Sequence, residues 1–246
     1  MAEEMSGNSG TAALYDALNR DRSDLDAYVG VVEELGARRV LDIGCGTGVF
    51  ALLLAARGAE VVGVEPARAS LDVARAKPGA GRVRWIHGDA TALPPLRADL
   101  ATMTANVAQE ITEGPAWYAT LRGAYRALRP GGHLVFESRD PARRAWEGWN
   151  RAESYGVTDV PGLGSVESWV DLVEVAGPLV TFRWTYVCAE DGATPEERLT
   201  EESTLRFRAR TEIEDDLAAC GYEVREVRDA ADRPGREFVF VARRPH

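Results

Sequence analysis

The segment Val40-Leu41-Asp42-Ile43-Gly44-Cys45-Gly46-Thr47-Gly48 decides the fold of this chain. A short apolar run leads into three glycines at alternate positions, and residues 49–57 continue as an apolar, helix-like stretch. Glycine is needed where a chain turns tightly or where a ligand lies against bare backbone. The N-terminus of the following helix offers unpaired N–H groups to an anion. We therefore predict a ligand-binding strand–loop–helix unit, with a tight turn alone as the alternative.

Short strands and helices alternate on both sides of this segment. A flexible tail (residues 1–10) and one helix (residues 11–35) are expected before it, and a turn at residues 129–132 after it. Strands are predicted at residues 39–43, 60–64, 83–87, 98–103 and 133–137, with helices at 49–57, 67–77 and 115–129. Five short buried strands separated by helices indicate an α/β fold with a doubly wound, Rossmann-like, mostly parallel sheet.

The pattern changes after residue 138. A short helix is expected at residues 140–150, and three alternating segments (166–175, 179–188 and 199–209) indicate an inserted antiparallel β-meander with a polar link at 189–198. Thr211 and Glu214 form a predicted capping box for a helix that ends at Gly221. Strands at 222–228 and 237–243 complete a hairpin. The predicted organisation is a binding domain (11–139 and 210–246) interrupted by an insertion (140–209).

The glycine spacing and the acidic residues around it indicate the ligand. A dinucleotide fingerprint is G-x-G-x-x-G, whereas this loop reads G-x-G-x-G and follows Asp42. That acid suits the ammonium and sulfonium groups of S-adenosylmethionine and repels a pyrophosphate. Glu65 ends the next strand, where a carboxylate can accept hydrogen bonds from both ribose hydroxyls. Asp89, after the third strand, could accept from the adenine amine, or it could be a turn residue.

On these residues the sequence resembles class I S-adenosylmethionine-dependent methyltransferases. The resemblance covers residues 11–139 and extends to 211–243. It implies a seven-stranded sheet of order 3-2-1-4-5-7-6, S-adenosylmethionine as cofactor and S-adenosylhomocysteine as product. It also implies that Tyr15 closes over the cofactor, although Tyr15 could simply pack. The cofactor-binding residues it predicts are Tyr15, Asp42, Gly44, Cys45, Gly46, Gly48, Glu65, Pro66, Asp89, Ala90 and Thr104.

The segment Met103-Thr104-Ala105-Asn106-Val107-Ala108-Gln109 follows the fourth strand, where the acceptor meets the methyl group in this family. It lacks the Asn-Pro-Pro-Tyr signature of enzymes that methylate planar amide or base nitrogens. The inserted sheet is similar to that of small-molecule N-methyltransferases, including those acting on amino sugars. The candidate catalytic residues are Asn106, Gln109 and Glu110, and the candidate acceptor-binding residues are Asn106, Gln109, Arg139, Trp146 and Trp149. Gln109 and Glu110 could instead cap the next turn, and the two tryptophans could pack their helix.

The histidines and the overall composition limit which acceptors and partners are expected. His87, His133 and His246 are poorly placed to serve as a general base, which favours an amine acceptor over a hydroxyl. A net charge of −10 and a pI near 5.0 argue against nucleic acid, and no apolar stretch is long enough for a membrane helix. The three scattered cysteines indicate neither a disulfide framework nor a metal site, which suits the cytoplasm.

Three functions remain in competition at this point. The leading hypothesis is a methyltransferase acting on a small molecule, and the insertion would cover its acceptor and contact a second subunit of a homodimer through Trp169, Val173 and Val187. A nicotinamide-dependent oxidoreductase is opposed by the glycine spacing and by Asp42. A non-catalytic protein that binds S-adenosylmethionine and docks a partner on the meander would keep the same cofactor motifs.

Overall fold

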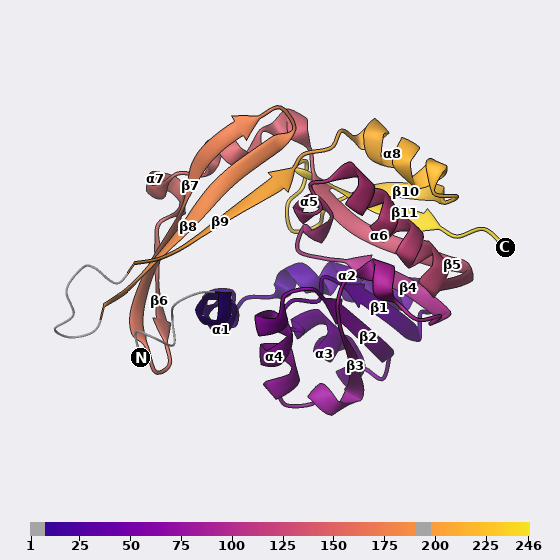
Figure 1. The fold of residues 1–246 in the computed structure, drawn as a ribbon, viewed down its shortest axis with the longest axis horizontal. Helices are drawn as coiled ribbons and strands as arrows, with labels where there is room; N and C mark the ends of the chain where they lie inside the picture. The colour runs from indigo at the N-terminus through magenta and orange to yellow at the C-terminus, as the bar shows by residue number, and fades with distance from the viewer. Residues whose placement is uncertain (1–7, 190–197) are drawn as a thin grey trace.

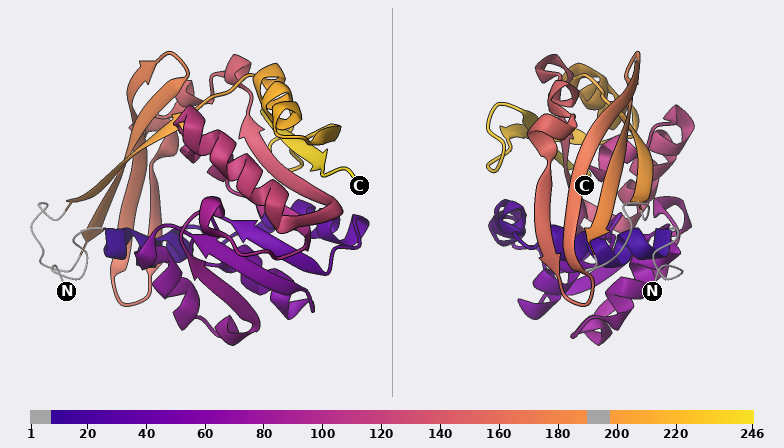
Figure 2. Two further views of the ribbon diagram at one scale, coloured as in Figure 1. Left: turned by 45° about the vertical axis from the view of Figure 1, so that its right-hand side comes forward. Right: turned by 90° about the vertical axis from the view of Figure 1, so that its left-hand side faces the viewer.

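The computed structural model describes residues 8–189 and 198–246, which form two β-sheets. A seven-stranded sheet with helices on both faces makes up the larger part, and a four-stranded antiparallel sheet arches beside it (Figure 1). The second sheet stands to one side of the α/β scaffold in the left view of Figure 2 and in front of it in the right view.

The larger sheet contains β1 (Arg39–Ile43), β2 (Glu60–Glu65), β3 (Val83–His87), β4 (Ala98–Met103), β5 (Leu128–Arg139), β10 (Glu223–Asp229) and β11 (Glu237–Arg243). Its order is β3-β2-β1-β4-β5-β11-β10, which confirms the order implied by the family resemblance. Strands β1 to β5 pair in parallel, whereas β11 pairs antiparallel to β5 and β10 antiparallel to β11. The carboxyl ends of β1, β2 and β4 therefore meet at one edge, where ligands bind in such folds.

Helices cover both faces of this sheet and bury two separate cores. They are α2 (Asp26–Glu34), α3 (Val49–Ala56), α4 (Arg68–Ala76), α5 (Val107–Glu110), α6 (Gly114–Ala127) and α8 (Arg210–Ala219), whereas α1 (Asn8–Leu18) and α7 (Arg151–Ser154) contact the second sheet. One core joins Leu121 of α6 and Leu217 of α8 to Phe136 of β5. The other joins Val29 of α2 and Leu54 of α3 to the opposite face. Both faces are apolar, which explains why the strands read as continuous apolar runs.

The second sheet has the order β6 (Gly156–Val160), β7 (Gly164–Ala176), β8 (Leu179–Ala189) and β9 (Arg198–Arg206). Its inner face is anchored at two places. Val180 packs with Trp146 and Phe207, while Val166 packs with Leu14 of α1. These contacts hold the sheet against both the N-terminal helix and the segment after β5.

The N-terminal helix differs from the prediction. The helix expected over residues 11–35 is two helices, separated by a break and a 3₁₀ turn at Ser23–Leu25. The backbone N–H and the side-chain amide of Asn19 both donate to the Tyr15 carbonyl (3.0 and 2.8 Å), which ends α1. Asp21 then accepts from the Ser23 N–H (3.0 Å), a local bond that competes with helix. Of the predicted tail, residues 8–10 belong to α1 and residues 1–7 lie outside the described part.

Two segments around β5 also correct the prediction. The turn expected at residues 129–132 lies within β5, where a register shift opposite β4 accommodates the extra residues. The helix expected at 140–150 is two 3₁₀ turns (Pro141–Arg143 and Ala145–Gly148), interrupted at Arg144 with φ +46°. The tryptophans of this segment therefore do not share a regular helical face.

The insertion has one strand more than predicted, because β6 pairs with β7. The strand expected at 199–209 ends at Arg206, and residues 190–197 of the predicted link lie outside the described residues. The capping box is wrong. Ala209 occupies the N-cap position of α8 without a side-chain bond, and Glu214 accepts instead from Arg210 Nε (2.9 Å).

Candidate functional site

A cavity of about 470 Å³ lies at the carboxyl edge of the larger sheet, beneath α1 and beside β9. The loop after β1, the start of α4, the loop after β4 and one face of β9 form its walls. It is lined by Ala12, Tyr15, Arg22, Gly44, Cys45, Gly46, Thr47, Val49, Phe50, Glu65, Ala67, Arg68, Ala69, Ser70, Thr104, Ala105, Val107, Glu110, Glu201, Ser203 and Thr204. The structure thus brings together four of the predicted loop and ribose positions with Tyr15, Thr104 and Glu110.

The glycine loop presents bare backbone to this cavity. Gly44, Gly46 and Gly48 all have positive φ (+69°, +52° and +80°), a region that side chains rarely adopt. A Cβ on Gly44 would lie 2.6 Å from the Val107 methyl groups, and one on Gly48 would lie 2.6 Å from the Trp85 ring. A Cβ on Gly46 would meet no atom within 4 Å. Gly46 is thus open toward the space that a ligand would fill.

Glu65 ends β2 and is 7% exposed, with its carboxylate held by the loops on either side. Oε2 accepts from the Gly46 N–H (2.9 Å) and Oε1 from the Ala67 N–H (2.8 Å). Each carboxylate oxygen has a second lone pair, so both remain able to accept from ribose hydroxyls. Pro66, which follows, lies outside the lining, and its carbonyl is 3.1 Å from the His87 ring.

Asp42 lies under the glycine loop, is 1% exposed and does not line the cavity. Oδ1 accepts from the Thr102 hydroxyl (3.2 Å), whereas Oδ2 has no partner among the described residues. Burial raises the pKa of Asp42 to about 7. Its predicted bond to the cofactor ammonium stays a prediction. The unpartnered Oδ2 is the atom that would accept it.

The two residues predicted to contact the adenine, Asp89 and Ala90, lie away from the cavity. Asp89 is exposed and caps a 3₁₀ turn (Ala90–Ala92) by accepting from the Thr91 N–H (2.8 Å). Ala90 is buried in the core, and neither Asp89 nor Ala90 lines the cavity. The geometry is that of the turn residue considered as the alternative. An adenine contact by Asp89 stays a prediction.

Helix α1 is tied to the glycine loop by a contact that the sequence did not indicate. Asp16 Oδ1 accepts from the Thr47 hydroxyl (2.6 Å), and its carboxylate forms an ion pair with Lys77, the only lysine in the sequence. Lys77 Nζ also donates to the Thr47 carbonyl (2.7 Å). This tie, which we call the Asp16 latch, places Tyr15 at the cavity wall. The lone lysine was its only sequence signal.

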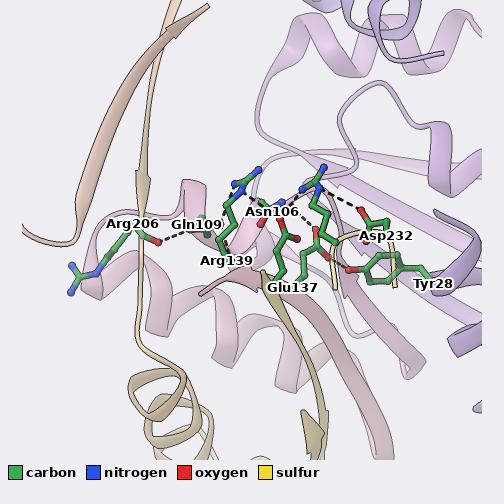
Figure 3. Close-up of polar contacts among 9 residues, drawn as sticks. Tyr28, Asn106, Gln109, Glu137, Arg139, Arg206 and Asp232 are labelled. Carbon is green, nitrogen blue, oxygen red and sulfur yellow. Dashed lines mark hydrogen bonds and ion pairs between the residues drawn. The ribbon is translucent and has the colours of Figure 1, made fainter. Parts of the chain in front are cut away.

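The loop after β4 is strained and rests on a buried carboxylate. Ala105 and Asn106 both have positive φ (+59° and +63°), which is costly for residues with side chains. Glu137 of β5 accepts from the Asn106 N–H (2.5 Å) and from the Tyr28 hydroxyl (Figure 3). Burial raises the pKa of Glu137 to about 7. Asn106 is itself buried, and only its neighbours in this loop line the cavity.

Gln109 and Arg139 form a buried tie between the two sheets. Gln109 Oε1 accepts from the Arg139 backbone and side chain (both 3.2 Å), and its Nε2 lies 3.4 Å from the Arg206 carbonyl of β9 (Figure 3). Arg139 also contacts Glu237 (3.4 Å) and stacks over the Trp149 ring. None of these side chains lines the cavity, so their predicted acceptor contacts stay predictions.

Trp146 and Trp149 pack against other aromatic rings, which is the alternative to acceptor binding that the sequence left open. The ring of Trp146 meets that of Phe207 at 4.6 Å, and the ring of Trp149 meets that of Phe182 at 4.9 Å. These contacts join the segment after β5 to the inner face of the second sheet. Neither tryptophan lines the cavity.

Two carboxylates face the cavity opposite the glycine loop. Glu110, at the end of α5, was predicted as a candidate, whereas Glu201, on β9, was missed. The sequence signal for Glu201 was weak, because an acidic residue on an alternating strand is usually solvated. Ser203 and Thr204 reach the cavity from the same strand. The second sheet therefore supplies part of the cavity wall.

Among residues 8–189 and 198–246, no group of three or more His, Cys, Asp or Glu side chains is arranged to hold a metal ion. In the same part of the chain, no helix is long and apolar enough to cross a membrane.

The fold and the cavity define a class: the doubly wound S-adenosylmethionine-dependent methyltransferases of class I. The residues present fit that cofactor, because Gly46 leaves room against the backbone and the Glu65 carboxylate faces the same space. Comparison with known proteins agrees. Residues 40–132 match the family described as "Methyltransferase domain".

Two curated proteins, one an N-terminal methyltransferase and one an O-methyltransferase, are similar to about half of this chain. The cypemycin N-terminal methyltransferase of Streptomyces sp. is 40% identical over 119 residues, which are 48% of this chain and 49% of that protein. The ubiquinone biosynthesis O-methyltransferase of Alkalilimnicola ehrlichii is 32% identical over 115 residues, 46% of this chain and 47% of that protein. The chain thus spans about half the length of these curated relatives.

A solved structure extends the likeness to the whole fold. The S-adenosylmethionine-bound amino pentose methyltransferase CalS10 of Micromonospora echinaspora, involved in calicheamicin biosynthesis, superposes with a TM-score of 0.69 at 23% identity. It covers 95% of this chain and 96% of its own. At this identity the likeness establishes the fold, including the second sheet.

Proposed function

We propose that this protein is an S-adenosylmethionine-dependent methyltransferase (EC 2.1.1.-) that methylates the nitrogen of a small-molecule amine. The observation that carries the proposal is the cavity in which the glycine loop and Glu65 face Glu110. One wall suits the cofactor, and the opposite wall offers a carboxylate where an acceptor would meet the methyl group. The bound cofactor supplies an already activated methyl group, so the protein mainly binds, orients and excludes water.

The titration of Glu110 supports an amine. Desolvation at the cavity wall and, to a lesser extent, the carboxylates of Glu65 and Glu201 together raise the pKa of Glu110 to about 7. Such a group can take a proton from an ammonium, whereas an alcohol would require a stronger base during the attack. His87, His133 and His246 all lie in the described part of the chain, and none of them lines the cavity. The names of two similar proteins, an N-terminal methyltransferase and an amino pentose methyltransferase, refer to groups that carry an amine.

O-methylation is the second candidate. The ubiquinone biosynthesis relative is an O-methyltransferase, and Glu110 could accept the proton of an acidic hydroxyl. Such an acceptor would have to be far more acidic than an ordinary alcohol, because a carboxylate is a weak base. A screen of matched amines and alcohols separates N-methylation from O-methylation.

We assign the two parts of the chain different roles in this reaction. Residues 11–139 and 210–246 bind the cofactor, and residues 140–209 cover the acceptor. The packing of β9 along the cavity supports this division. The protein acts in the cytoplasm and forms a homodimer through the outer face of the second sheet.

Calorimetry tests the cofactor. We expect S-adenosylmethionine and S-adenosylhomocysteine to bind and NAD not to bind. Glu65→Ala removes charge-assisted hydrogen bonds and should weaken binding about ten- to hundred-fold. Glu60→Ala, at the exposed start of the same strand, is the control. Binding of NAD with no binding of S-adenosylhomocysteine would reject the proposal.

A screen of acceptors tests the reaction. The protein is incubated with S-adenosylmethionine and matched sets of amines and alcohols, and S-adenosylhomocysteine is measured. Turnover confined to amines supports the proposal, and turnover confined to hydroxyl compounds replaces it with O-methylation. If the cofactor binds and no acceptor raises turnover above background, the non-catalytic alternative gains.

A further inference from the structure

Glu110 and Glu201 meet in the cavity from two different sheets. Glu110 ends α5 directly after the strained β4 loop, and Glu201 lies in the middle of β9. Within residues 8–189 and 198–246, no hydrogen bond or ion pair involves either carboxylate. Two like charges facing one cavity are unfavourable, and Arg139, the cation that lowers the pKa of Glu110, does not line that cavity, so a cationic ligand would be stabilised between them.

The arginines of the cavity wall do not neutralise this pair. Arg22 is engaged by Asp24 through Nε and one terminal nitrogen (3.1 and 3.3 Å). Arg68 lies 3.7 Å from Asp72 of its own helix. The acceptor side therefore carries an excess of negative charge, which would repel an anionic acceptor.

Two aromatic rings of the second sheet lie near Glu201. Trp184 and Tyr186 of β8 stack with ring centroids 6.0 Å apart and planes at 10°. Trp184 lies directly opposite Glu201 in the β8–β9 register, so their side chains leave the same face of the sheet. Burial raises the pKa of Tyr186, and the charges of Glu201 and Tyr15 contribute in the same direction. Neither aromatic ring lines the cavity itself. Aromatic faces attract cations as carboxylates do.

We propose that the acceptor enters as a protonated amine, held between Glu110 and Glu201 beside the Trp184–Tyr186 stack, and that Glu110 takes its proton. The inference rests on the proposed function and specifies its substrate class: cationic amines rather than neutral or anionic acceptors. The ammonium proton passes to the Glu110 carboxylate, which frees the nitrogen lone pair. The nitrogen then bonds to the methyl carbon while the carbon–sulfur bond breaks, and its electron pair stays on sulfur.

A pair of isosteric probes tests the charge requirement without knowledge of the acceptor. Choline is a quaternary cation that cannot be methylated further, and 3,3-dimethylbutan-1-ol is its neutral counterpart. A panel of three further ammonium–neutral pairs of different size accompanies them. Binding is measured by calorimetry to the protein saturated with S-adenosylhomocysteine. We expect at least one cation to bind. Its neutral counterpart should bind at least ten-fold more weakly. Equal binding within every pair, or no binding by any cation, would overturn the inference.

Substitutions of Glu110 and Glu201 test which carboxylates bind the cation. Glu110→Gln and Glu201→Gln should each weaken the bound cation about ten-fold and leave affinity for S-adenosylhomocysteine within two-fold. Glu202→Gln is the matched control, because Glu202 leaves the opposite face of β9 and pairs with Arg183 (2.8 Å). Unchanged cation binding in both cavity variants would overturn the assignment.

Two outcomes separate this inference from other roles. If Glu110→Gln weakens S-adenosylmethionine but not S-adenosylhomocysteine or the cation, the carboxylate serves the sulfonium and the inference fails. If the wild-type protein does not bind S-adenosylhomocysteine, the proposed function itself fails. The two failures are thus distinguishable.

The pH dependence of cation binding gives an independent readout. The groups that act on Glu110 are Glu65, Glu201 and Arg139, and Glu110 in turn acts on Tyr15. Since the Glu110 pKa is about 7, choline affinity should fall as the pH drops from 8 to 6 and Glu110 gains a proton. Glu110→Gln should lose this pH dependence. A pH dependence that survives in Glu110→Gln contradicts the role of Glu110.

Discussion

Gly44, Gly46 and Gly48 share positive φ but differ in what surrounds them. The first and third lie against Val107 and Trp85, so their missing side chains make room for packing. The second faces open space at the cavity wall, so its missing side chain makes room for a ligand. Residues of one motif thus serve stability and binding separately.

We expect Gly46→Val to abolish most cofactor binding while the protein stays folded. The side chain would fill the cavity, and the left-handed backbone costs about 1–2 kcal/mol of stability. Gly48→Val is the comparison, because its side chain would clash with Trp85 and lower the unfolding temperature much further. Calorimetry with S-adenosylhomocysteine and thermal unfolding check both variants. Wild-type affinity in Gly46→Val would show that this face of the loop is not the cofactor site.

At the scale of elements, α1 has few anchors for its position over the cavity. Leu14 packs against Val160 and Val166 of the second sheet, and the Asp16 latch joins it to the glycine loop and to Lys77. Because the latch is partly exposed, its individual bonds contribute little to global stability. Its consequence is local, since it determines where Tyr15 lies.

Asp16→Asn should loosen α1 more than it destabilises the fold. The variant loses the ion pair with Lys77, so we expect faster amide hydrogen exchange in α1 and a several-fold weaker affinity for S-adenosylhomocysteine. Asp72→Asn, which removes exposed contacts to Arg68 and Arg75, is the control. Unchanged exchange in α1 of Asp16→Asn would show that the latch does not hold the helix.

Buried carboxyl groups join the elements around the site and make the stability of the whole molecule depend on pH. Burial raises the pKa of Asp42 and Glu137 to about 7, well above the values of the unfolded chain. Between about pH 4.5 and 7 the folded state holds protons that the unfolded state has released. Their contribution to stability is therefore complete below pH 4.5 and is lost as the pH rises through 7. The lowered pKa of His133 acts in the opposite direction.

Glu137→Gln isolates one of these contributions. The wild type should lose stability relative to the variant as the pH rises from 5 to 8, because the glutamine has no proton to release. Urea unfolding at pH 5 and pH 8 measures the difference, with the exposed Glu60→Gln as control. The same stability difference at both pH values would contradict a raised pKa for Glu137.

The outer face of the second sheet provides the prediction for the assembly. Trp169 is covered by Arg151, whose guanidinium lies 4.3 Å from its ring centroid, so it offers less contact area than the sequence indicated. Val173 is 45% exposed near the β7–β8 turn. We expect a homodimer by light scattering at micromolar concentration and a monomer for Val173→Asp. A monomeric wild type would end the dimer proposal.

The sequence by itself determined the strand–glycine loop–helix unit, Glu65 and the parallel core of the sheet. These features are local: residues close along the chain carry both the periodicity and the turn chemistry, so no distant contact is needed to infer them. The order of the seven strands followed from the family resemblance and was confirmed. The errors fell in irregular segments, such as residues 129–132 and 140–150, where a bulge and a left-handed residue decide the path.

Only the tertiary structure decided which distant residues meet. Glu201 joins Glu110 because β9 packs along α5, and Asp16 meets Lys77 because α1 folds over the loop. Gln109 lies in a buried tie to Arg139 for the same reason. Each pair consists of ordinary charged or polar residues with no periodic or spacing signal. Their roles arise from burial and proximity, which the sheet topology creates after the chain has folded.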